Sequence, residues 1–197
     1  MRLAVLASGR GSNLQAILDA IAAGTLDAEI VGVFSDKPSA QALRRVPEPL
    51  RWSRNAKDYP NRAAFDAELA TAVAATRPDW VVCAGYMRIL GDAFVQQFRG
   101  HLLNIHPSLL PRHRGLHTHA GALAAGDGEH GASVHFVVPE LDAGAVIAQA
   151  ALPVLATDTP ESLAARVLRL EHPLLVAVLQ MAAAGRITEQ AAQATLD

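Results

Sequence analysis

Short apolar runs, each about the length of a strand, alternate with segments of helical spacing in the first half of the chain. The apolar runs cover residues 2–7, 28–35, 80–84 and 102–106, and the helical segments cover 13–23, 61–76 and 91–98. Near-continuous apolar strands that alternate with helices are typical of a parallel sheet covered on both faces. The pattern is weak at 38–59, where we expect a short helix and then a strand near Leu50.

The pattern changes after Pro111. A basic loop, a helix and two strands are expected in turn, at 112–115, 117–126, 132–139 and 145–153. The connection at 140–144 is too short to hold a helix, so the last two strands are expected to pair antiparallel. The fold class is therefore α/β, a doubly wound and mostly parallel sheet with an antiparallel C-terminal portion.

The last helical segment covers 159–184, with Pro160 in its first turn and Gly185 at its end. Pro173 lies inside this segment, and proline both removes a helical hydrogen bond and clashes with the preceding turn. We expect a kink or break near Glu171. The polar tail at 186–197 is expected to be loosely attached, and residues 1–197 are expected to form one domain.

Composition and charge narrow the classes of protein. Hydrophobic residues make up 51% of 197 residues, enough for one core, and the net charge of −2 gives no uniform positive field for a polyanion such as DNA. The lone cysteine, Cys83, excludes an intramolecular disulfide framework and lies in an apolar run typical of a buried strand. No apolar stretch approaches the ~20 residues that span a bilayer. We expect a soluble cytoplasmic protein with no nucleic-acid or membrane partner.

An amide and an imidazole end the apolar run at 102–106. Asn104 and His106 are two residues apart, immediately before Pro107. Alternate residues of a strand face the same side, so both side chains should project together. An amide N–H can donate to a developing oxyanion, and an imidazole can move a proton near neutral pH. This pair indicates a reaction centre rather than a packing pattern.

A glycine loop at 9–13 follows the first strand and opens the first helix. Backbone N–H groups and the helix dipole make such a loop an anion site, and phosphate is the expected occupant. A dinucleotide loop would need a third glycine where Leu14 stands, and the Gly-Lys-Ser/Thr ending of a P-loop is absent. The structural alternative is a glycine turn that only joins strand to helix. Ser12 and Asn13 favour the binding interpretation because they add donors.

Asp142 lies in the turn between the last two strands, where a surface acid is the ordinary outcome. In an open α/β sheet, however, ligands bind outside the carboxyl ends of the parallel strands. A loop that returns over that edge can place a carboxylate beside an imidazole. We therefore expect Asp142 to orient His106 and to raise its pKa.

Five motifs occur together, at 8–15, 85–90, 104–111, 115–119 and 140–144. In this order and spacing they resemble the family of phosphoribosylglycinamide formyltransferases, from the first residue to about Gly185. The resemblance implies a doubly wound sheet of the formyltransferase type. It also implies glycinamide ribonucleotide as formyl acceptor, 10-formyltetrahydrofolate as donor, and no metal. Where the family often has Asp-Gly-Gly-Pro this chain has Asp142-Ala143-Gly144-Ala145, and Ser133 stands where threonine is frequent.

The resemblance also implies roles for individual residues. The implied catalytic set is Asn104, His106 and Asp142. The implied acceptor-binding residues are Gly11, Ser12 and Asn13 at the phosphate and Glu171 near the ribose, although Glu171 alone reads as a solvated helix acid. The implied donor-binding residues are Met87, Arg88, Ile89 and Leu90 beside the folate, with Arg62 and Arg88 near its glutamate tail.

The implied chemistry suits these residues. Attack of an amine on a formyl carbon creates a negative oxygen and a positive nitrogen, so the site must stabilise the first and deprotonate the second. Asn104 and a protonated His106 would stabilise the oxygen. Asp142, directly or through water held near Ser133, would help to move the proton.

Other functions compete with this interpretation. A metal site would draw on the histidines at 113, 117, 119, 130 and 135, but the i, i+2 spacing of His117 and His119 does not direct both rings one way. A non-catalytic nucleotide-binding module would keep the glycine loop without needing the catalytic set. Among enzymes, formyltransferases for methionyl-tRNA or amino sugars usually carry an extra C-terminal domain, and formyltetrahydrofolate hydrolases an extra N-terminal one. Neither extra domain is expected here.

Overall fold

The computed structural model describes residues 1–189 and residue 192. Within this part of the chain, seven strands form one sheet in the order β3-β2-β1-β4-β5-β6-β7. The chain divides into two compact units, with the boundary after Asn104. The mixed, mostly parallel sheet confirms the expected fold class, whereas a single domain over 1–197 stays a prediction. Most of the expected loose tail lies outside the described residues.

Five strands and three helices account for most of the first unit. The strands are β1 (Arg2–Leu6), β2 (Glu29–Ser35), β3 (Arg51–Ser53), β4 (Trp80–Cys83) and β5 (Leu102–His106), whose last two residues belong to the second unit; the helices are α1 (Ser12–Ala22), α2 (Arg62–Ala75) and α3 (Asp92–Gln97). Short 3-10 turns at Gln41–Arg45 and Glu48–Leu50 precede β3, and a third covers Ala56–Asp58. The segment at 38–59, where the pattern is weak, thus forms short helical turns and a short strand, as predicted.

All strand pairs from β3 to β5 are parallel, and β1 lies between β2 and β4. Residues Leu3 to Leu6 of β1 are fully buried. A central parallel strand is covered on both faces, which is why its sequence is apolar at successive positions rather than at alternate ones.

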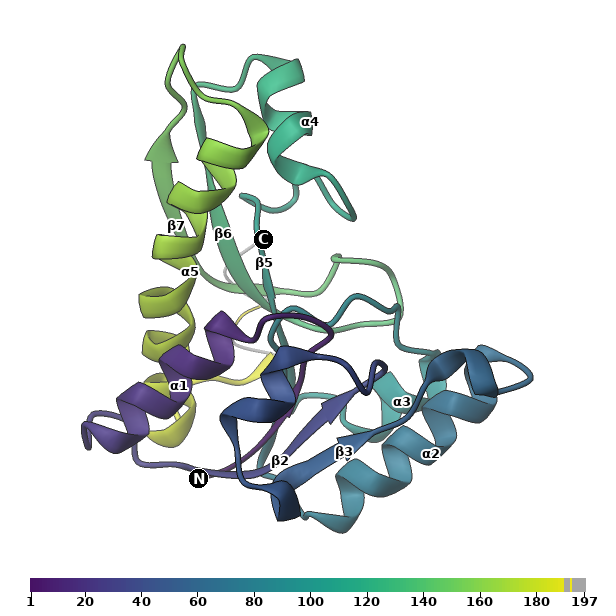
Figure 1. Ribbon diagram of the computed structural model, residues 1–197. Helices are drawn as coiled ribbons and strands as arrows, with labels where there is room; N and C mark the ends of the chain where they lie inside the picture. The colour runs from purple at the N-terminus through teal and green to yellow at the C-terminus, as the bar shows by residue number, and fades with distance from the viewer. Residues whose placement is uncertain (190–191, 193–197) are drawn as a thin grey trace. The chain divides into compact units, whose positions relative to one another are not determined.

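The strand order reverses between β1 and β4. The chain moves from β1 to β2 in one direction and from β4 to β5 in the other, so right-handed crossovers place α1 and α3 on opposite faces of the sheet. Helix α2 packs against α3 (Figure 1). The loops that leave β1 and β4 therefore meet at the topological switch point, where doubly wound folds bind ligands.

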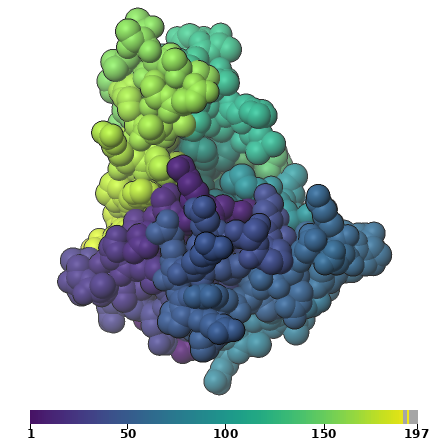
Figure 2. Space-filling model, in the orientation of Figure 1, coloured from purple at the N-terminus to yellow at the C-terminus, as the bar shows by residue number. Residues whose placement is uncertain are grey.

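The second unit is built on a hairpin of β6 (Glu129–Phe136) and β7 (Val146–Pro153), which pair antiparallel as predicted. Helix α5 (Pro160–Ala183) packs on both strands, and α4 (Thr118–Ala125) packs against α5 (Figure 1). The buried residues of α5 recur at helical spacing, as Leu163, Val167, Leu174 and Val178 show. Its other face lies at the surface, drawn in yellow-green in Figure 2.

Two expectations for this unit were wrong. Strand β6 begins at Glu129, three residues before the predicted start. Gly131, which looks like a turn residue, is needed inside the strand because a Cβ there would lie 1.9 Å from the Ala150 carbonyl oxygen of β7. Helix α5 also continues through Pro173 as one helix of 24 residues, so the chain does not break there, whereas a kink stays a prediction.

None of the helices in the described part of the chain is both long and apolar enough to span a membrane.

The start of α5 gives a stability test. Thr159 Oγ1 accepts a hydrogen bond from Ser162 N at 3.3 Å, and Ser162 Oγ accepts one from Thr159 N at 2.9 Å. Thr159→Ala removes one half of this capping box and should lower the free energy of unfolding by about 1 kcal/mol in urea titrations. Thr159→Ser keeps the hydroxyl and should remain close to the wild type. Equal losses in both variants would contradict a capping role.

Candidate functional site

The glycine loop after β1 has a backbone that only glycine fits easily. Gly11 has a positive φ of 72°, and a Cβ there would lie 2.7 Å from Ala42 Cβ. Gly11 is the N-cap of α1 and provides no side-chain cap, so the first N–H groups of the helix are not satisfied by a capping side chain. Ser12 is half-buried and Asn13 is buried. These features are those of an anion site at a helix N-terminus.

Arg45 adds a positive charge to this loop and was not anticipated from the sequence. Its Nε donates to the Arg10 carbonyl oxygen at 2.8 Å, and its Nη1 donates to Gln15 Oε1 at 2.7 Å. A Cβ on Gly11 would lie 3.2 Å from Arg45 Nε. The segment around Arg45 has little periodicity, so nothing in the pattern indicated that this guanidinium lies at the loop.

The loop after β4 is fixed to the glycine loop by one serine. Ser8 N donates to the Gly85 carbonyl oxygen at 3.0 Å, and Ser8 Oγ accepts from Met87 N at 2.9 Å. The same hydroxyl donates to Asp36 Oδ1 at 2.6 Å. The two loops at the switch point are therefore neighbours that share a buried polar anchor.

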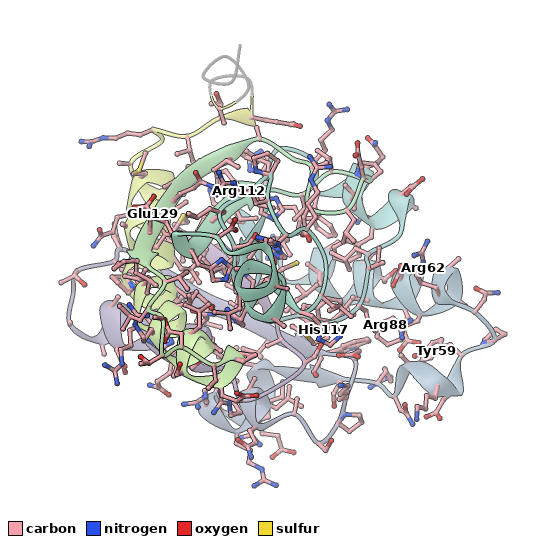
Figure 3. All side chains as sticks on the ribbon, turned by 90° about the horizontal axis from the view of Figure 1, so that it is seen from above. Tyr59, Arg62, Arg88, Arg112, His117 and Glu129 are labelled. Carbon is pink, nitrogen blue, oxygen red and sulfur yellow. The ribbon has the colours of Figure 1, made fainter. Side chains whose placement is uncertain are left out.

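The loop after β4 exposes apolar side chains beside a cation. Met87 and Ile89 are 60% and 51% exposed, whereas Leu90 is buried. Exposed apolar side chains of this size on one loop suit an apolar ring system as ligand. Arg88 lies between them in sequence, half-buried, with its guanidinium carbon 5.1 Å from the centre of the Phe65 ring. Arg62 is exposed at the start of α2, and Figure 3 shows it on the same side of the first unit as Arg88.

In the second unit, the structure brings His106 and Asp142 together. His106 is the last residue of β5 and is 6% exposed; its Nδ1 lies 3.5 Å from Asp142 Oδ2. The Asp142 backbone has a positive φ of 48°, and its Oδ2 accepts from Gly115 N at 2.8 Å. The predicted partnership of these two side chains is confirmed as a contact. Asn104 precedes His106 by two residues in the same strand and is half-buried.

His135 is a third member of this cluster that sequence reasoning did not place there. Its Nε2 lies 3.7 Å from Asp142 Oδ1, and its Nδ1 lies 2.7 Å from the Phe136 carbonyl oxygen. Burial lowers the pKa of His135, although the Phe136 carbonyl and Asp142 act in the opposite direction. A neutral His135 leaves His106 as the ring that can balance the carboxylate. The irregular register at Val134 and His135 explains why strand alternation did not reveal it.

His106 has an acceptor at each ring nitrogen. Its Nε2 lies 2.9 Å from the His113 carbonyl oxygen, and its Nδ1 faces Asp142. Imidazolium is the form of histidine with two N–H donors. The Asp142 carboxylate and the His113 carbonyl oxygen could therefore accept from both N–H groups of an imidazolium ring.

The Ser133 hydroxyl has no hydrogen-bonding position left for the water that we expect near it, and that water stays a prediction. The hydroxyl donates to the Ser108 carbonyl oxygen at 2.6 Å and accepts from Leu110 N at 3.0 Å and Gln149 Nε2 at 2.8 Å. One donor and two acceptor positions are all that a hydroxyl has. Ser133 is fully buried, and its role is to hold the loop after β5 against β7.

Of the remaining histidines of this unit, three pair with one another or with an acid. His113 Nε2 lies 2.7 Å from Asp127 Oδ2, and His119 Nδ1 lies 3.1 Å from His130 Nε2. His117 is the N-cap of α4 and has a positive φ of 59°. Among the residues that the structure describes, no group of three side chains converges as a metal ion would require.

Glu171 lies on α5 and is 8% exposed. The ordinary interpretation of this residue, a solvated helix acid, is therefore wrong. Acids are almost never buried without a specific reason, so burial makes Glu171 a stronger candidate for a binding role than its sequence context did.

The comparisons with known proteins agree with this geometry. The family described as "Formyl transferase" matches residues 1–179. The chain belongs to the formyl transferase family. It is 46% identical to phosphoribosylglycinamide formyltransferase of Escherichia coli (strain K12), over all of this chain and 94% of that one. It is also 42% identical to the human trifunctional purine biosynthetic protein adenosine-3, over 94% of this chain but 19% of that one.

Solved formyltransferases share the fold. Glycinamide ribonucleotide transformylase 1 from Symbiobacterium toebii superposes with a TM-score of 0.91 at 41% identity, covering 94% of this chain and 89% of that one. The family match extends over both units and includes every candidate site residue. The resemblance first drawn from five motifs is thereby confirmed.

The paired histidines make stability depend on pH. Burial is the main cause that lowers the pKa of His130, from 6.5 to about 4, and the pKa of His119 is also lowered by burial. A lowered histidine pKa means that folding favours the neutral ring, so its contribution is present above pH 6.5 and is lost as pH falls toward 4. Urea midpoints should therefore drop between pH 7.5 and 5.0, and His130→Asn should drop less. His101→Asn, at an exposed position, should keep the wild-type slope; equal slopes for all three proteins would contradict this origin.

Proposed function

We propose that this formyltransferase transfers a formyl group from 10-formyltetrahydrofolate to the amine of glycinamide ribonucleotide. The observation that carries the proposal is the contact of His106 with Asp142 at the carboxyl end of β5, in a chain whose relatives include phosphoribosylglycinamide formyltransferase. Membership of the formyl transferase family supports a folate-derived donor. A cytoplasmic location stays a prediction.

The reaction requires charge to be stabilised at one atom and removed from another. The acceptor amine attacks the formyl carbon, a C–N bond forms, and the carbonyl oxygen becomes an oxyanion. Asn104 and imidazolium His106 donate hydrogen bonds to that oxygen. Since His106 Nε2 faces the His113 carbonyl oxygen, that bond is exchanged for one to the formyl oxygen as the donor binds.

The attacking nitrogen is positively charged once the C–N bond has formed, so it then has to lose a proton. Asp142 accepts it, directly or through the solvent, and His106 keeps the carboxylate oriented. The oxyanion then re-forms the carbonyl group as the bond between the formyl carbon and N10 of the folate breaks, and N10 takes up the proton that Asp142 has accepted. The donor already carries an activated formyl group, so no step calls for a metal.

The substrates are assigned to residues as follows. The acceptor phosphate is held by Gly11, Ser12 and Asn13, with charge from Arg45 nearby, and Glu171 hydrogen-bonds the ribose region. Met87, Ile89 and Leu90 contact the folate ring system, and Arg62 and Arg88 bind the carboxylate groups of its glutamate tail.

One assay separates this proposal from its rivals. The purified protein is given 10-formyltetrahydrofolate with glycinamide ribonucleotide, methionyl-tRNA, an amino sugar or water as the acceptor. Formyl transfer to glycinamide ribonucleotide at more than about a hundred times the rate of the others is the expected result. Faster transfer to any other acceptor would replace the proposed function.

Substitution of Gly11 tests the phosphate assignment. Gly11→Val would place a branched side chain at a positive φ and against Ala42, so the loop backbone could no longer approach a phosphate closely. The acceptor KM should rise by about tenfold or more with the donor KM nearly unchanged. Gly128→Ala, where a Cβ meets nothing within 4 Å, is the matched control. A folded Gly11→Val enzyme with a normal acceptor KM would reject the assignment.

Substitution of Asp142 tests the proton step. Asp142→Asn nearly preserves shape but removes the charge that balances His106, so kcat should fall by about 10²–10⁴ with both KM values close to normal. The double variant with His106→Ala should lose much less than the product of the single losses, because the two groups act as one unit. Glu140→Gln changes an exposed acid in the same turn and should leave kcat unchanged. A folded Asp142→Asn enzyme of normal kcat would disprove this mechanism.

A further inference from the structure

The first unit contains a buried carboxylate that the proposed mechanism does not use. Asp66 lies on α2 and is 5% exposed, and its Oδ2 accepts a hydrogen bond from Gly91 N at 2.8 Å. Burial raises the pKa of Asp66, while the Gly91 bond and the charges of Arg62 and Arg88 oppose that rise. A carboxyl group held inside a protein, where burial disfavours its charged form, requires a reason.

Asp66 joins the two segments that carry the arginines. Arg62 is one helical turn before it on α2, an i, i+4 pair on the same face of the helix. Gly91 closes the loop after β4, three residues beyond Arg88. The hydrogen bond from Gly91 to Asp66 therefore connects the helix that bears one guanidinium to the loop that bears the other.

The approach at Gly91 is too close for a side chain. A Cβ on Gly91 would lie 2.9 Å from Asp66 Oδ2 and 4.0 Å from Arg62 Nε. The φ of Gly91 is −75°, which any residue can adopt, so the constraint comes from the carboxylate and not from the backbone. Glycine at 91 is what lets the acid reach the loop.

The two arginines are directed by their surroundings but are not neutralised by a close anion. The Arg88 guanidinium lies over the Phe65 ring, and its buried Nε has no hydrogen-bond partner among the described residues. In the same part of the chain, neither arginine forms an ion pair within 4.0 Å. Figure 3 shows both on one side of the first unit, near Tyr59. Two cations in this arrangement suit a carboxylate ligand.

We propose that Asp66 is a positioning residue for the formyl donor: by holding Gly91 and attracting both guanidinium groups, it sets Arg62 and Arg88 for the glutamate carboxylates of the folate. The role rests on the proposed function. The Asp66 carboxylate attracts the arginines without forming a direct ion pair with either. A direct ion pair would occupy the N–H donors that the ligand carboxylates need.

Removal of either partner tests this role. Asp66→Ala should raise the KM for 10-formyltetrahydrofolate by about tenfold, with kcat and the acceptor KM within twofold of wild type. Gly91→Ala should do the same, since its Cβ pushes Asp66 away. In the Asp66→Ala background there is room for that Cβ, so Gly91→Ala should then have no further effect. Asp92→Asn, an exposed acid next to Gly91, is the control and should behave as wild type.

A truncated donor distinguishes positioning of the arginines from general structural damage. With a 10-formyl donor that ends at the benzoyl group and has no glutamate, Asp66→Ala and Gly91→Ala should each change KM by less than twofold. A tenfold loss for both donors, or an unchanged KM for the complete donor, overturns the role of Asp66. If Asp66→Ala does not fold, Gly91→Ala with the two donors gives the same decision. A wild-type protein without transfer to glycinamide ribonucleotide would instead refute the proposed function.

Discussion

The hydroxyl of Ser8 is the contact on which the ligand-binding edge of the first unit depends. It donates to Asp36 Oδ1, just beyond β2, and accepts from Met87 N in the loop after β4. Parallel strands bring their carboxyl ends to one edge, but they do not determine how the loops beyond them are arranged. A buried serine with a committed donor and acceptor determines it, because every alternative leaves a polar group unsatisfied inside the protein. The glycine loop and the loop after β4 are therefore held as one structure.

The second unit solves a different problem, which is to hold a largely buried carboxylate beside an imidazole ring. Asp142 adopts a left-handed backbone that costs about 1 kcal/mol for an ordinary residue and less for aspartate. The bond from Gly115 N compensates for this cost and fixes one oxygen. Burial lowers the pKa of His135 and so favours its neutral form, while His106 faces the other carboxylate oxygen. Gly144 makes the turn possible, since a Cβ there would lie 1.8 Å from the Phe136 carbonyl oxygen. The alanines at 143 and 145, where the family often has glycine and proline, are compatible with this turn.

Much of this could be predicted because its causes are local. Apolar runs and helical spacing identified the parallel sheet and the hairpin, and the i, i+2 pattern identified Asn104 and His106. What the sequence could not provide depends on close approach between distant residues. Glycine is a common turn residue, and the sequence does not show that Gly131 lies against the Ala150 carbonyl group. His135 lies where a register irregularity breaks the alternation of the strand. Single-residue patterns contain no information on either contact.

Counting hydrogen bonds separates the structural polar residues from the functional ones in a way that residue type does not. Water held near Ser133 was expected to help the proton step, yet the Ser133 hydroxyl has used every donor and acceptor position on the protein itself. The Ser133 hydroxyl is therefore committed to holding the fold. Asp66 is buried, and its Oδ1 has no hydrogen-bond partner in the described part of the chain. A buried carboxyl oxygen without a partner raises the free energy of the folded protein, which is what makes Asp66 a candidate for a role beyond folding.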